Sequence, residues 1–385
     1  MTAKRITIIN QDSGYLMIDI ANSFASKGFE TTIIAGRIVE RNTPLNNDVK
    51  VNKIVRYNRK SIFMRIITWL IGFVQIWLHI MTKHRNEELL IVSNPPIAPF
   101  VALFCRNKFN VLIFDLYVET LQEYHPFGTK SVLVYLWKRL HTNIFKRAKT
   151  IFVLTEGMKQ NLEKYTFGKE VGILSLWTDN AYIKPIDKAN NLFIKRHGIE
   201  NKFIILYSGN IGFSSGVEDI VRLAKKFTDN KDICFLIIGD GILKSKIQDR
   251  IKDLNLNNCI LLPWQDQAVL PYSLASAQLS IVSLSAKSST NSIPSKVYNY
   301  ISVGSPVLCI ADSDSDISKF VLLNEVGKSF TTNELDFAED YIRHLYNNPN
   351  ELEEIKTHTQ IVSGKFTSEN AEKYVRYIAN KQSVC

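Results

Sequence analysis

Short apolar runs rich in β-branched residues alternate with segments of helical periodicity along the whole sequence. Strands buried on both faces of a parallel sheet have this composition, and parallel strands need crossover connections, which are usually helices. The alternation therefore predicts an α/β fold. The predicted strands are residues 6–10, 31–35, 89–93, 111–115, 150–155 and 172–175 in the first half, and 203–209, 234–239, 259–262, 279–284 and 307–310 in the second.

The runs fall into two sets, so we expect two doubly wound parallel-sheet domains. A length of 385 residues suits two domains of ordinary size. We place the first domain at residues 1–182, a polar linker without strands at 183–202 and the second domain at 203–362. A helical segment within 363–385 is expected to cross back to the first domain. Ligands of such sheets bind beyond the C-terminal strand ends, so two domains facing each other would form a cleft.

The charge is uneven along the chain, which carries a formal net charge of +10. Residues 1–185 contain 25 Lys and Arg against 14 Asp and Glu, whereas residues 186–385 contain 22 against 23. This asymmetry indicates an anionic partner for the first domain, either a membrane or nucleic acid, or else solvated basic faces.

The five cysteines form no C-x-x-C pair, which argues against a disulfide framework or a structural zinc site. The N-terminal MTAKRITIIN enters a strand at once, so no secretory signal is expected.

Residues 61–85 form the most unusual segment, because Arg65 is the only charged residue between Ser61 and Thr82. Three structures are compatible with it: a transmembrane span, a helix buried within the domain, and a helix lying in the plane of a bilayer. A second basic, aromatic helix at 132–149 could lie on the same surface. The polar positions share one narrow stripe, and the membrane-facing residues of the in-plane hypothesis are Trp69, Phe73, Trp77, Lys83 and Arg85.

Two segments of the second half have the composition of an anion site. In SGNIG, Gly209 and Gly212 would let backbone N–H groups approach a phosphate, although a tight turn without a ligand is equally compatible. In NSIPSKVYNYISVGSPV, Ser295 and Lys296 stand where Pro294 starts a short helix. The unpaired N–H groups of a helix start, together with a lysine, favour an anion. Neither segment is a dinucleotide G-x-G-x-x-G or a P-loop.

The order YSGNIG, FLIIGDG, LPWQDQAVLPYSLASAQLSIV and IPSKVYNYISVGSPVL resembles the C-terminal half of family-4 retaining glycosyltransferases of GT-B fold. The sequence is most similar to the bacterial branch that transfers N-acetylated deoxysugars in O-antigen and capsule assembly. SNPPIAP and FDLYVETL in the first half agree with that branch. The resemblance implies two Rossmann-like domains that face a cleft.

The resemblance also implies roles for residues of this chain. Ser295 and Lys296 would hold the phosphates of a nucleotide-sugar donor. In the family two glutamates lie eight residues apart, and Asn291 and Asn299 occupy their positions in this chain. Asn299 could still hydrogen-bond ribose hydroxyls. The remaining donor-binding residues would be Gly14, Gly209, Asn210, Gly212, Pro263 and Trp264.

Asp115, Glu119 and Lys296 are the candidate catalytic residues. A strand-end carboxylate such as Asp115 could act as a general base or charge stabiliser, or could cap a helix. Lys296 and the helix starts would stabilise the leaving diphosphate, so neither a metal nor another cofactor is expected. The Asp-rich stretch at 312–316 is expected to be a solvated loop, although a metal there remains an alternative.

The sequence thus predicts a glycosyltransferase that moves an N-acetylated sugar, with retention, from a UDP-linked donor to a polyprenyl-diphosphate-linked saccharide. It would act as a peripheral protein on the cytoplasmic face of the inner membrane, in O-antigen, capsule or exopolysaccharide biosynthesis. The alternatives are a UDP-sugar epimerase of the same fold and a non-catalytic, membrane-associated partner subunit. No nucleic-acid partner is expected, because nucleic acid would leave the apolar helix unexplained.

Overall fold

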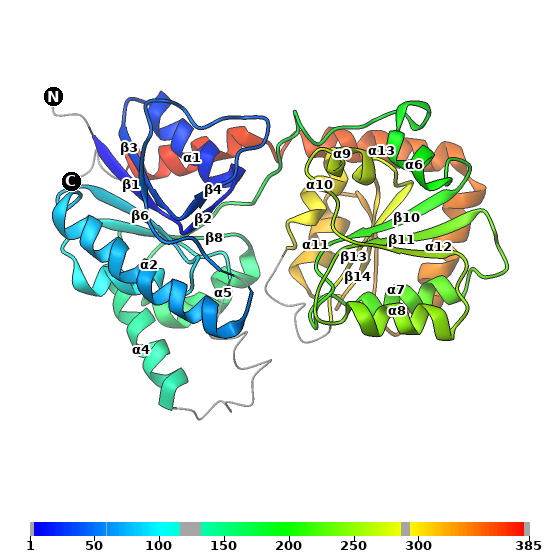
Figure 1. Cartoon of the computed structure of the whole chain (residues 1–385), viewed down its shortest axis with the longest axis horizontal. Helices are drawn as coiled ribbons and strands as arrows, with labels where there is room; N and C mark the ends of the chain where they lie inside the picture. Colours follow the sequence, from blue (N-terminus) through cyan, green and yellow to red (C-terminus); the bar gives the residue numbers. More distant parts are fainter. Residues whose placement is uncertain (1–3, 59, 116–131, 286–292, 381–385) are drawn as a thin grey trace. The chain divides into compact units, whose positions relative to one another are not determined.

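The computed structural model describes residues 4–58, 60–115, 132–285 and 293–380. The chain divides into two compact units. Unit 1 comprises Met1–Leu176 and Ser368–Cys385, and unit 2 comprises Trp177–Thr367. Each unit has its own parallel sheet, coloured blue to green in unit 1 and green to orange in unit 2 (Figure 1).

Unit 1 contains a seven-stranded parallel sheet in the order β5-β3-β1-β6-β7-β8-β9. The central strands are buried, which explains their uninterrupted apolar composition. A two-stranded pair, β2 (Asp12–Ser13) and β4 (Arg37–Ile38), follows β1 and β3 in sequence. The sheet strands are β1 (Arg5–Ile9), β3 (Glu30–Ala35), β5 (Lys50–Lys53), β6 (Glu88–Val92), β7 (Phe109–Leu112), β8 (Thr150–Val153) and β9 (Val171–Ile173).

Helices cover both faces of this sheet. One face carries α1 (Tyr15–Ser26) and α14 (Ala371–Asn380), which pack against each other (Figure 1). The other face carries α2 (Ile62–Thr82), the 3-10 helix η1 (Ala98–Phe104), α4 (Val132–Arg147) and α5 (Glu156–Thr166). On that face η1 packs against both α2 and α4.

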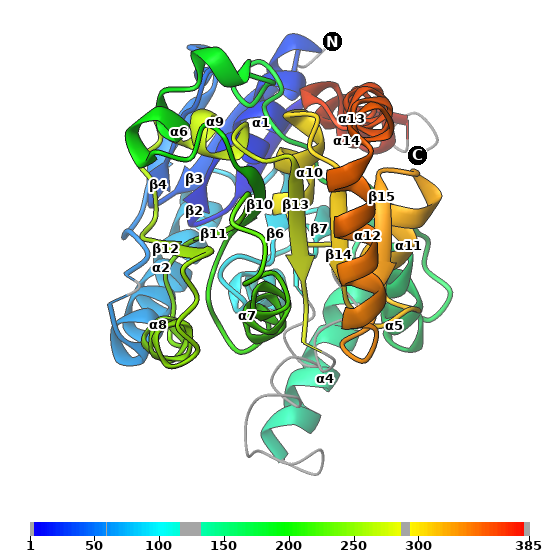
Figure 2. The same ribbon diagram turned by 90° about the vertical axis from the view of Figure 1, so that its right-hand side faces the viewer.

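Unit 2 contains a six-stranded parallel sheet in the order β12-β11-β10-β13-β14-β15. Its strands are β10 (Phe203–Ser208), β11 (Ile233–Ile238), β12 (Cys259–Leu262), β13 (Leu279–Ser283), β14 (Val307–Ile310) and β15 (Gly327–Phe330). Figure 2 shows α7 (Val217–Lys225) and α8 (Lys244–Asp253) on one side of it and α9 (Leu270–Leu274), α10 (Lys296–Ser302) and α13 (Pro349–Ser363) on the other. The remaining elements are the 3-10 helices η2 (Lys188–Asn190) and η4 (Ser368–Asn370, in unit 1), α6 (Leu192–His197), α11 (Asp316–Leu323) and α12 (Leu335–Asn347).

The predicted fold class of two doubly wound parallel sheets is confirmed, and each of the predicted strands has a counterpart within two or three residues of its bounds. Two edge strands were missed, because KVNK in β5 and GKSF in β15 are too polar to give a strand signal. The unit boundaries fall at 176/177 and 367/368 rather than at 182 and 362. Residues 183–202, expected to be a linker, include α6, which buries Phe193 and Ile194 within unit 2.

Candidate functional site

The loop after β10 begins at Gly209 and is held by two buried tyrosines. Tyr207 donates its hydroxyl to the carbonyl of Asn210 at 2.8 Å. The Tyr300 hydroxyl accepts from the Ser208 N–H at 2.7 Å and donates to the Ser208 carbonyl at 3.2 Å. Burial raises the pKa of both phenols, so both remain protonated donors at neutral pH. The turn at the C-terminal end of β10 is therefore fixed by side chains of its own unit.

Lys296 extends from the first position of α10 to this loop. Its Nζ lies 3.8 Å from the centroid of the Tyr207 ring, in cation–π contact. It also lies so close to Gly209 that a Cβ there would be 2.4 Å from Nζ. No carboxylate pairs with Lys296 in the described residues, and burial lowers its pKa to about 7. A cation without an anion partner beside a glycine turn is a favourable place for a phosphate.

The turn after β11 interlocks with the Gly209 loop. Gly239 approaches so closely that a Cβ on it would be 1.9 Å from the Gly209 carbonyl oxygen. Gly241 has a φ of +154° and a Cβ there would be 2.4 Å from the Ile211 carbonyl oxygen. The Ile211 N–H in turn donates to the Asp240 carbonyl at 2.8 Å. Only glycine permits this approach. The glycines of FLIIGDG therefore determine the shape of the Gly209 loop, and the turn they form is not an ordinary turn at a strand end.

Two backbone donors of the Gly209 loop remain unused in the described part of the chain. The N–H groups of Gly212 and Phe213 have no hydrogen-bond partner there, although Ser215 donates its hydroxyl to the Gly212 carbonyl at 2.6 Å. The loop leads into α7, whose N-cap Gly216 supplies no side-chain cap. Free N–H groups before a helix start provide hydrogen bonds and a favourable dipole for an anion. The role of Gly212 at a donor diphosphate stays a prediction.

The other predicted donor residues of unit 2 lie at the same C-terminal edge of the sheet. Pro263 and Trp264 follow β12 directly, and Trp264 is 53% exposed, so its ring face is open to a planar ligand. Ser295 is exposed at the N-cap of α10, and Asn210 is exposed in the loop. Asn299 is half-buried and its Oδ1 accepts from the Thr178 hydroxyl at 2.6 Å, so its oxygen is already occupied. Asn291 lies outside the described residues.

The predicted residues of the first half belong to unit 1. Gly14 is the N-cap of α1 and has extended backbone, and no atom lies within 4 Å of the position that a Cβ would occupy, so this turn is open. Asp115 is exposed, three residues beyond the end of β7. Glu119 lies outside the described residues. Within the described residues no three His, Cys, Asp or Glu side chains form a group that could hold a metal.

Helix α2 is inverted relative to a normal surface helix, because the middle of its polar stripe, from Thr68 to His79, faces the protein while Arg65 is exposed. Gln11 donates its Nε2 to the carbonyls of Val55 at 3.0 Å and Thr68 at 2.9 Å. The Val55 N–H donates to Gln75 Oε1 at 2.6 Å. Gly72 is buried against the Gln11 amide, where a Cβ would be 2.7 Å from Nε2. The stripe identified in the sequence is thus the face that anchors the helix to the strand ends of unit 1.

The apolar face of α2 is correspondingly exposed. The stretch Phe63–Thr82 is long and apolar enough to cross a membrane by length and composition, and 22% of its most apolar window is buried. The burial expected of a core helix is therefore not observed. The exposed apolar side chains of α2 are Phe63, Ile66, Leu70, Ile71, Val74, Trp77, Leu78 and Met81.

The residues expected to face a membrane are not all exposed. Trp77, Lys83 and Arg85 are exposed. Phe73 is half-buried and contacts the exposed Phe104 of η1 edge-on, with ring centroids 6.2 Å apart. Trp69 differs, because it stacks on Tyr57 with ring centroids 5.8 Å apart and lies half-buried. Exposed apolar residues continue on α4, where they are Val132, Tyr135 and Leu136.

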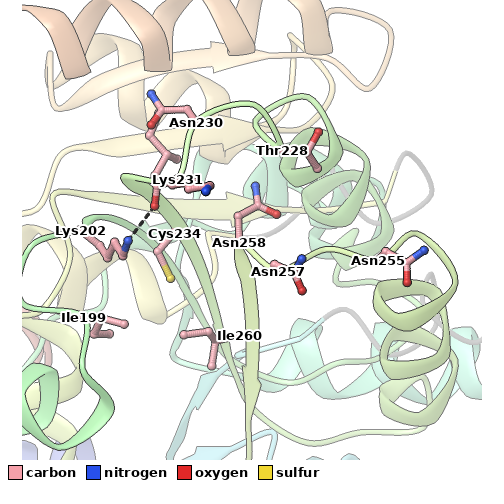
Figure 3. Close-up of a pocket in the computed structure, with 11 residues that line it drawn as sticks. Ile199, Lys202, Thr228, Asn230, Lys231, Cys234, Asn255, Asn257, Asn258 and Ile260 are labelled. Carbon is pink, nitrogen blue, oxygen red and sulfur yellow. Dashed lines mark hydrogen bonds between the residues drawn. The ribbon is translucent and has the colours of Figure 1, made fainter.

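A separate pocket of unit 2 lies at the opposite edge of the sheet from the Gly209 loop (Figure 3). Its volume is about 350 Å³, and its walls are formed by residues that precede β10 and by residues before and at the starts of β11 and β12. Lys202 crosses it to donate to the Lys231 carbonyl at 2.8 Å. Its polar lining is mainly amide side chains: Asn230, Asn255, Asn257 and Asn258. None of the predicted donor residues lines it.

Sequence reasoning missed Tyr207, Tyr300, Gly239, Gly241 and Thr178. The sequence could have indicated Tyr300, since it lies four residues after Lys296 and therefore on the same face of α10. The glycines of FLIIGDG were noted, but their close approach to the Gly209 loop depends on the pairing of β10 with β11, which sequence spacing does not give.

The second half of the chain matches a known family model, and the chain is similar to known glycosyltransferases. Residues 190–361 match the family model of glycosyl transferases group 1. The chain is 21% identical over 289 residues to the probable glycosyltransferase WbjE of Pseudomonas aeruginosa, covering 73% of this chain and 71% of that protein. It is 26% identical over 165 residues to the putative colanic acid biosynthesis glycosyl transferase WcaI of Escherichia coli, covering 42% and 40%.

Solved structures show the same fold at low identity. Anabaena Alr3699/HepE in complex with UDP superimposes with a TM-score of 0.72 at 13% identity, over 99% of this chain and 100% of that chain. WaaG, a glycosyltransferase involved in lipopolysaccharide biosynthesis, superimposes with a TM-score of 0.70 at 13% identity, over 97% and 99%. The fold of two Rossmann-like units is therefore the GT-B fold.

Proposed function

We propose that this chain, a group 1 glycosyltransferase of GT-B fold, transfers an N-acetylated sugar from a UDP-linked donor to a polyprenyl-diphosphate-linked saccharide. The observation that carries the proposal is the contact between Lys296 and the Gly209 loop, which places a cation without a carboxylate partner in the described residues beside free loop N–H groups. UDP is chosen because the similar Alr3699/HepE structure contains UDP. A role in polysaccharide assembly is supported by the names of WcaI and WaaG.

The proposed chemistry follows from where charge develops. Transfer breaks the bond between the sugar and the diphosphate, so negative charge grows on the leaving UDP while the sugar becomes oxocarbenium-like. The Lys296 ammonium and the N–H groups of Gly212 and Phe213 would stabilise that charge without reorganising, since Tyr207 and Tyr300 already fix the loop. Trp264 would stack on the base, and Asp115 would serve the acceptor as base or charge stabiliser. We propose retention of configuration and no metal or other cofactor.

The acceptor proposal is supported by α2. A helix that turns its polar stripe inward and its apolar side chains outward leaves a large apolar surface that water does not favour. A bilayer would cover that surface, and the basic first half would favour anionic lipid. We therefore place the protein on the cytoplasmic face of the inner membrane, as a peripheral protein. This location would bring it to a lipid-linked saccharide.

A thermal-shift panel of UDP, GDP, dTDP and their sugars tests the donor site. A ligand that binds only the folded protein adds about 2.7 kcal/mol at one hundred times its Kd. We expect the melting temperature to rise with UDP and UDP-sugars. If no nucleotide raises it, the donor-site assignment is wrong and the non-catalytic subunit becomes the better proposal. If a guanine or thymine nucleotide alone raises it, the site stands and the choice of UDP is wrong.

A further inference from the structure

An open groove of about 830 Å³ lies at the N-terminal edge of the unit 1 sheet. Its walls are formed by residues at the starts of β1, β6, β7 and β8 and by the turn after α2. Seven lining side chains are Lys or Arg and two are Glu, so the formal charge of the lining is +5. Ligands of such sheets bind at the C-terminal strand ends, so this groove is distinct from the donor and acceptor sites.

The two glutamates of the groove are already satisfied by neighbours. Glu87 accepts from the Thr7 hydroxyl at 2.5 Å and lies 2.8 Å from His84 Nδ1. Glu88 accepts from Asn110 at 2.7 Å and pairs with Lys149 at 3.3 Å. These carboxylates therefore do not neutralise the remaining cations.

Four cationic side chains of the lining make no hydrogen bond or ion pair with a described residue, and one of them, Lys4, lies over the Phe29 ring, 5.8 Å from its centroid. The side chains of Arg85, Arg106 and Lys108 are exposed and make no hydrogen bond or ion pair with any described residue. Arg147, by contrast, donates to the carbonyls of Ala102 and Cys105 at 2.7 and 2.8 Å and so fixes one wall. Like charges that share a groove repel one another, and an anion between them removes that cost.

The groove is lined by residues that follow α2 and η1 closely in sequence. Arg85 stands three residues beyond the last residue of α2, and Arg106 stands two residues beyond η1. Phe104, the last residue of η1, is 60% exposed and meets Phe73 of α2. An unpaired cation thus follows each of these apolar elements within three residues. Apolar residues in the acyl region with basic residues at headgroup level are the arrangement of an interfacial protein.

We propose that this groove binds the phosphate-bearing headgroup of an anionic lipid while the apolar face of α2 lies in the bilayer. The inference rests on the membrane part of the proposed function and adds a defined headgroup site to it. Arg85 and Arg106 suit a lipid phosphate because guanidinium groups can bind it through paired N–H donors.

Vesicle flotation tests the site with the full chain and two triple variants. The groove variant is Arg85→Gln, Arg106→Gln and Lys108→Gln. The matched control, Lys252→Gln, Lys319→Gln and Lys328→Gln, removes the same charge from exposed unit 2 residues. Each cation near an anionic surface raises the partition coefficient roughly fivefold. We therefore expect the groove variant to partition roughly 100-fold less onto phosphatidylcholine vesicles that contain phosphatidylglycerol. The control variant should partition like the wild type, and binding to pure phosphatidylcholine should be equal for all three.

The other outcomes overturn the inference in distinguishable ways. Equal losses in both triple variants would mean that net charge, not the groove, attracts the vesicle. Release of the wild type by inorganic phosphate at constant ionic strength would identify the groove as a site for free phosphate. Failure of the wild type to float on any vesicle would overturn the membrane part of the proposed function together with the groove. The UDP thermal shift of the groove variant should match the wild type, which separates these results from misfolding and from failure of the donor site.

Discussion

At the scale of single residues, Lys296 is the side chain on which the proposed donor binding would depend most. We expect Lys296→Met, which keeps the length of the stem, to raise the Kd for UDP roughly 10- to 100-fold, because a charge-assisted hydrogen bond contributes about 1.5–3 kcal/mol. Isothermal titration calorimetry at pH 7 measures this. The same substitution at Lys252, exposed on α8 of the same unit, is the control and should leave the Kd unchanged. An unchanged Kd in Lys296→Met would remove Lys296 from the donor site.

The lowered pKa of Lys296 would give the proposed UDP binding a defined pH dependence. Burial lowers this pKa to about 7, so the free protein holds a mostly neutral amine above pH 7. A bound diphosphate favours the ammonium and raises the pKa, so binding takes up a proton above pH 7. The affinity should therefore fall as the pH rises from about 7 to about 9 and level off below about 7. Phosphate itself titrates near pH 6, outside this window.

Calorimetry in two buffers of different ionisation enthalpy measures this proton uptake at pH 8. The Lys296→Met variant should show none. Proton release, or an affinity that rises with pH, would contradict the prediction. The unliganded protein should also gain stability between about pH 7 and about pH 9, because the unfolded chain, with an ordinary lysine, binds more protons there than the folded chain.

At the scale of elements, the interlocked turns after β10 and β11 predict an unusual sensitivity to one methyl group. In Gly239→Ala the added Cβ would lie 1.9 Å from the Gly209 carbonyl oxygen, and backbone cannot move aside as a side chain can. We expect a loss of about 1–3 kcal/mol and a weaker UDP thermal shift. Gly14→Ala is the control, since no atom lies within 4 Å of its Cβ position, and it should lose less than about 1 kcal/mol. Equal melting temperatures for the two variants would contradict the interlocking.

Apolar-to-polar substitutions in a helix usually cost more stability than the loss of a polar side chain. Because α2 buries the middle of its polar stripe and exposes its apolar face, we expect the opposite order there. Gln11→Ala leaves the Val55 and Thr68 carbonyls without their donor, which should cost about 1–3 kcal/mol and lower the melting temperature by several degrees. Leu70→Ser and Val74→Ser, on the exposed apolar face, should leave the stability in detergent-free buffer unchanged within about 0.5 kcal/mol. Calorimetric scans of the three variants test this. A larger loss for Leu70→Ser than for Gln11→Ala would mean that the apolar face packs against protein.

The contrast between α2 and the edge strands shows what the sequence could predict. Periodicity identified the polar stripe of α2, but it did not reveal that the stripe faces inward, because that depends on Gln11 at a distant strand end. The buried central strands were predictable because burial on both faces forces an apolar composition, whereas β5 and β15, at the sheet edges, tolerate polar residues. The Ser295–Lys296 pair was likewise visible in the sequence. Its contact with Gly209 required the tertiary structure.

At the scale of the whole molecule, the two units differ in the surfaces they present. Unit 1 carries the exposed apolar face of α2 and the basic groove, whereas unit 2 carries Lys296 and the Gly209 loop. The charge excess of the first half follows this division. A lipid-linked acceptor for one unit and a soluble nucleotide for the other would account for both features. The division also separates the proposed transferase from the epimerase alternative, since an epimerase has no need of a membrane surface.

A triple variant of α2, Leu70→Ser, Val74→Ser and Trp77→Ser, should therefore separate donor binding from transfer. We expect an unchanged UDP thermal shift, because the substituted residues lie in unit 1 and Lys296 in unit 2. Transfer to a polyprenyl-diphosphate-linked saccharide in vesicles should fall at least roughly tenfold, since each exposed apolar side chain that leaves the bilayer forfeits about 1.5–3 kcal/mol of burial. The assay follows UDP release, and the identity of the UDP-sugar that remains, with and without acceptor vesicles. Conversion of a UDP-sugar without acceptor, equal in wild type and variant, would instead identify an epimerase.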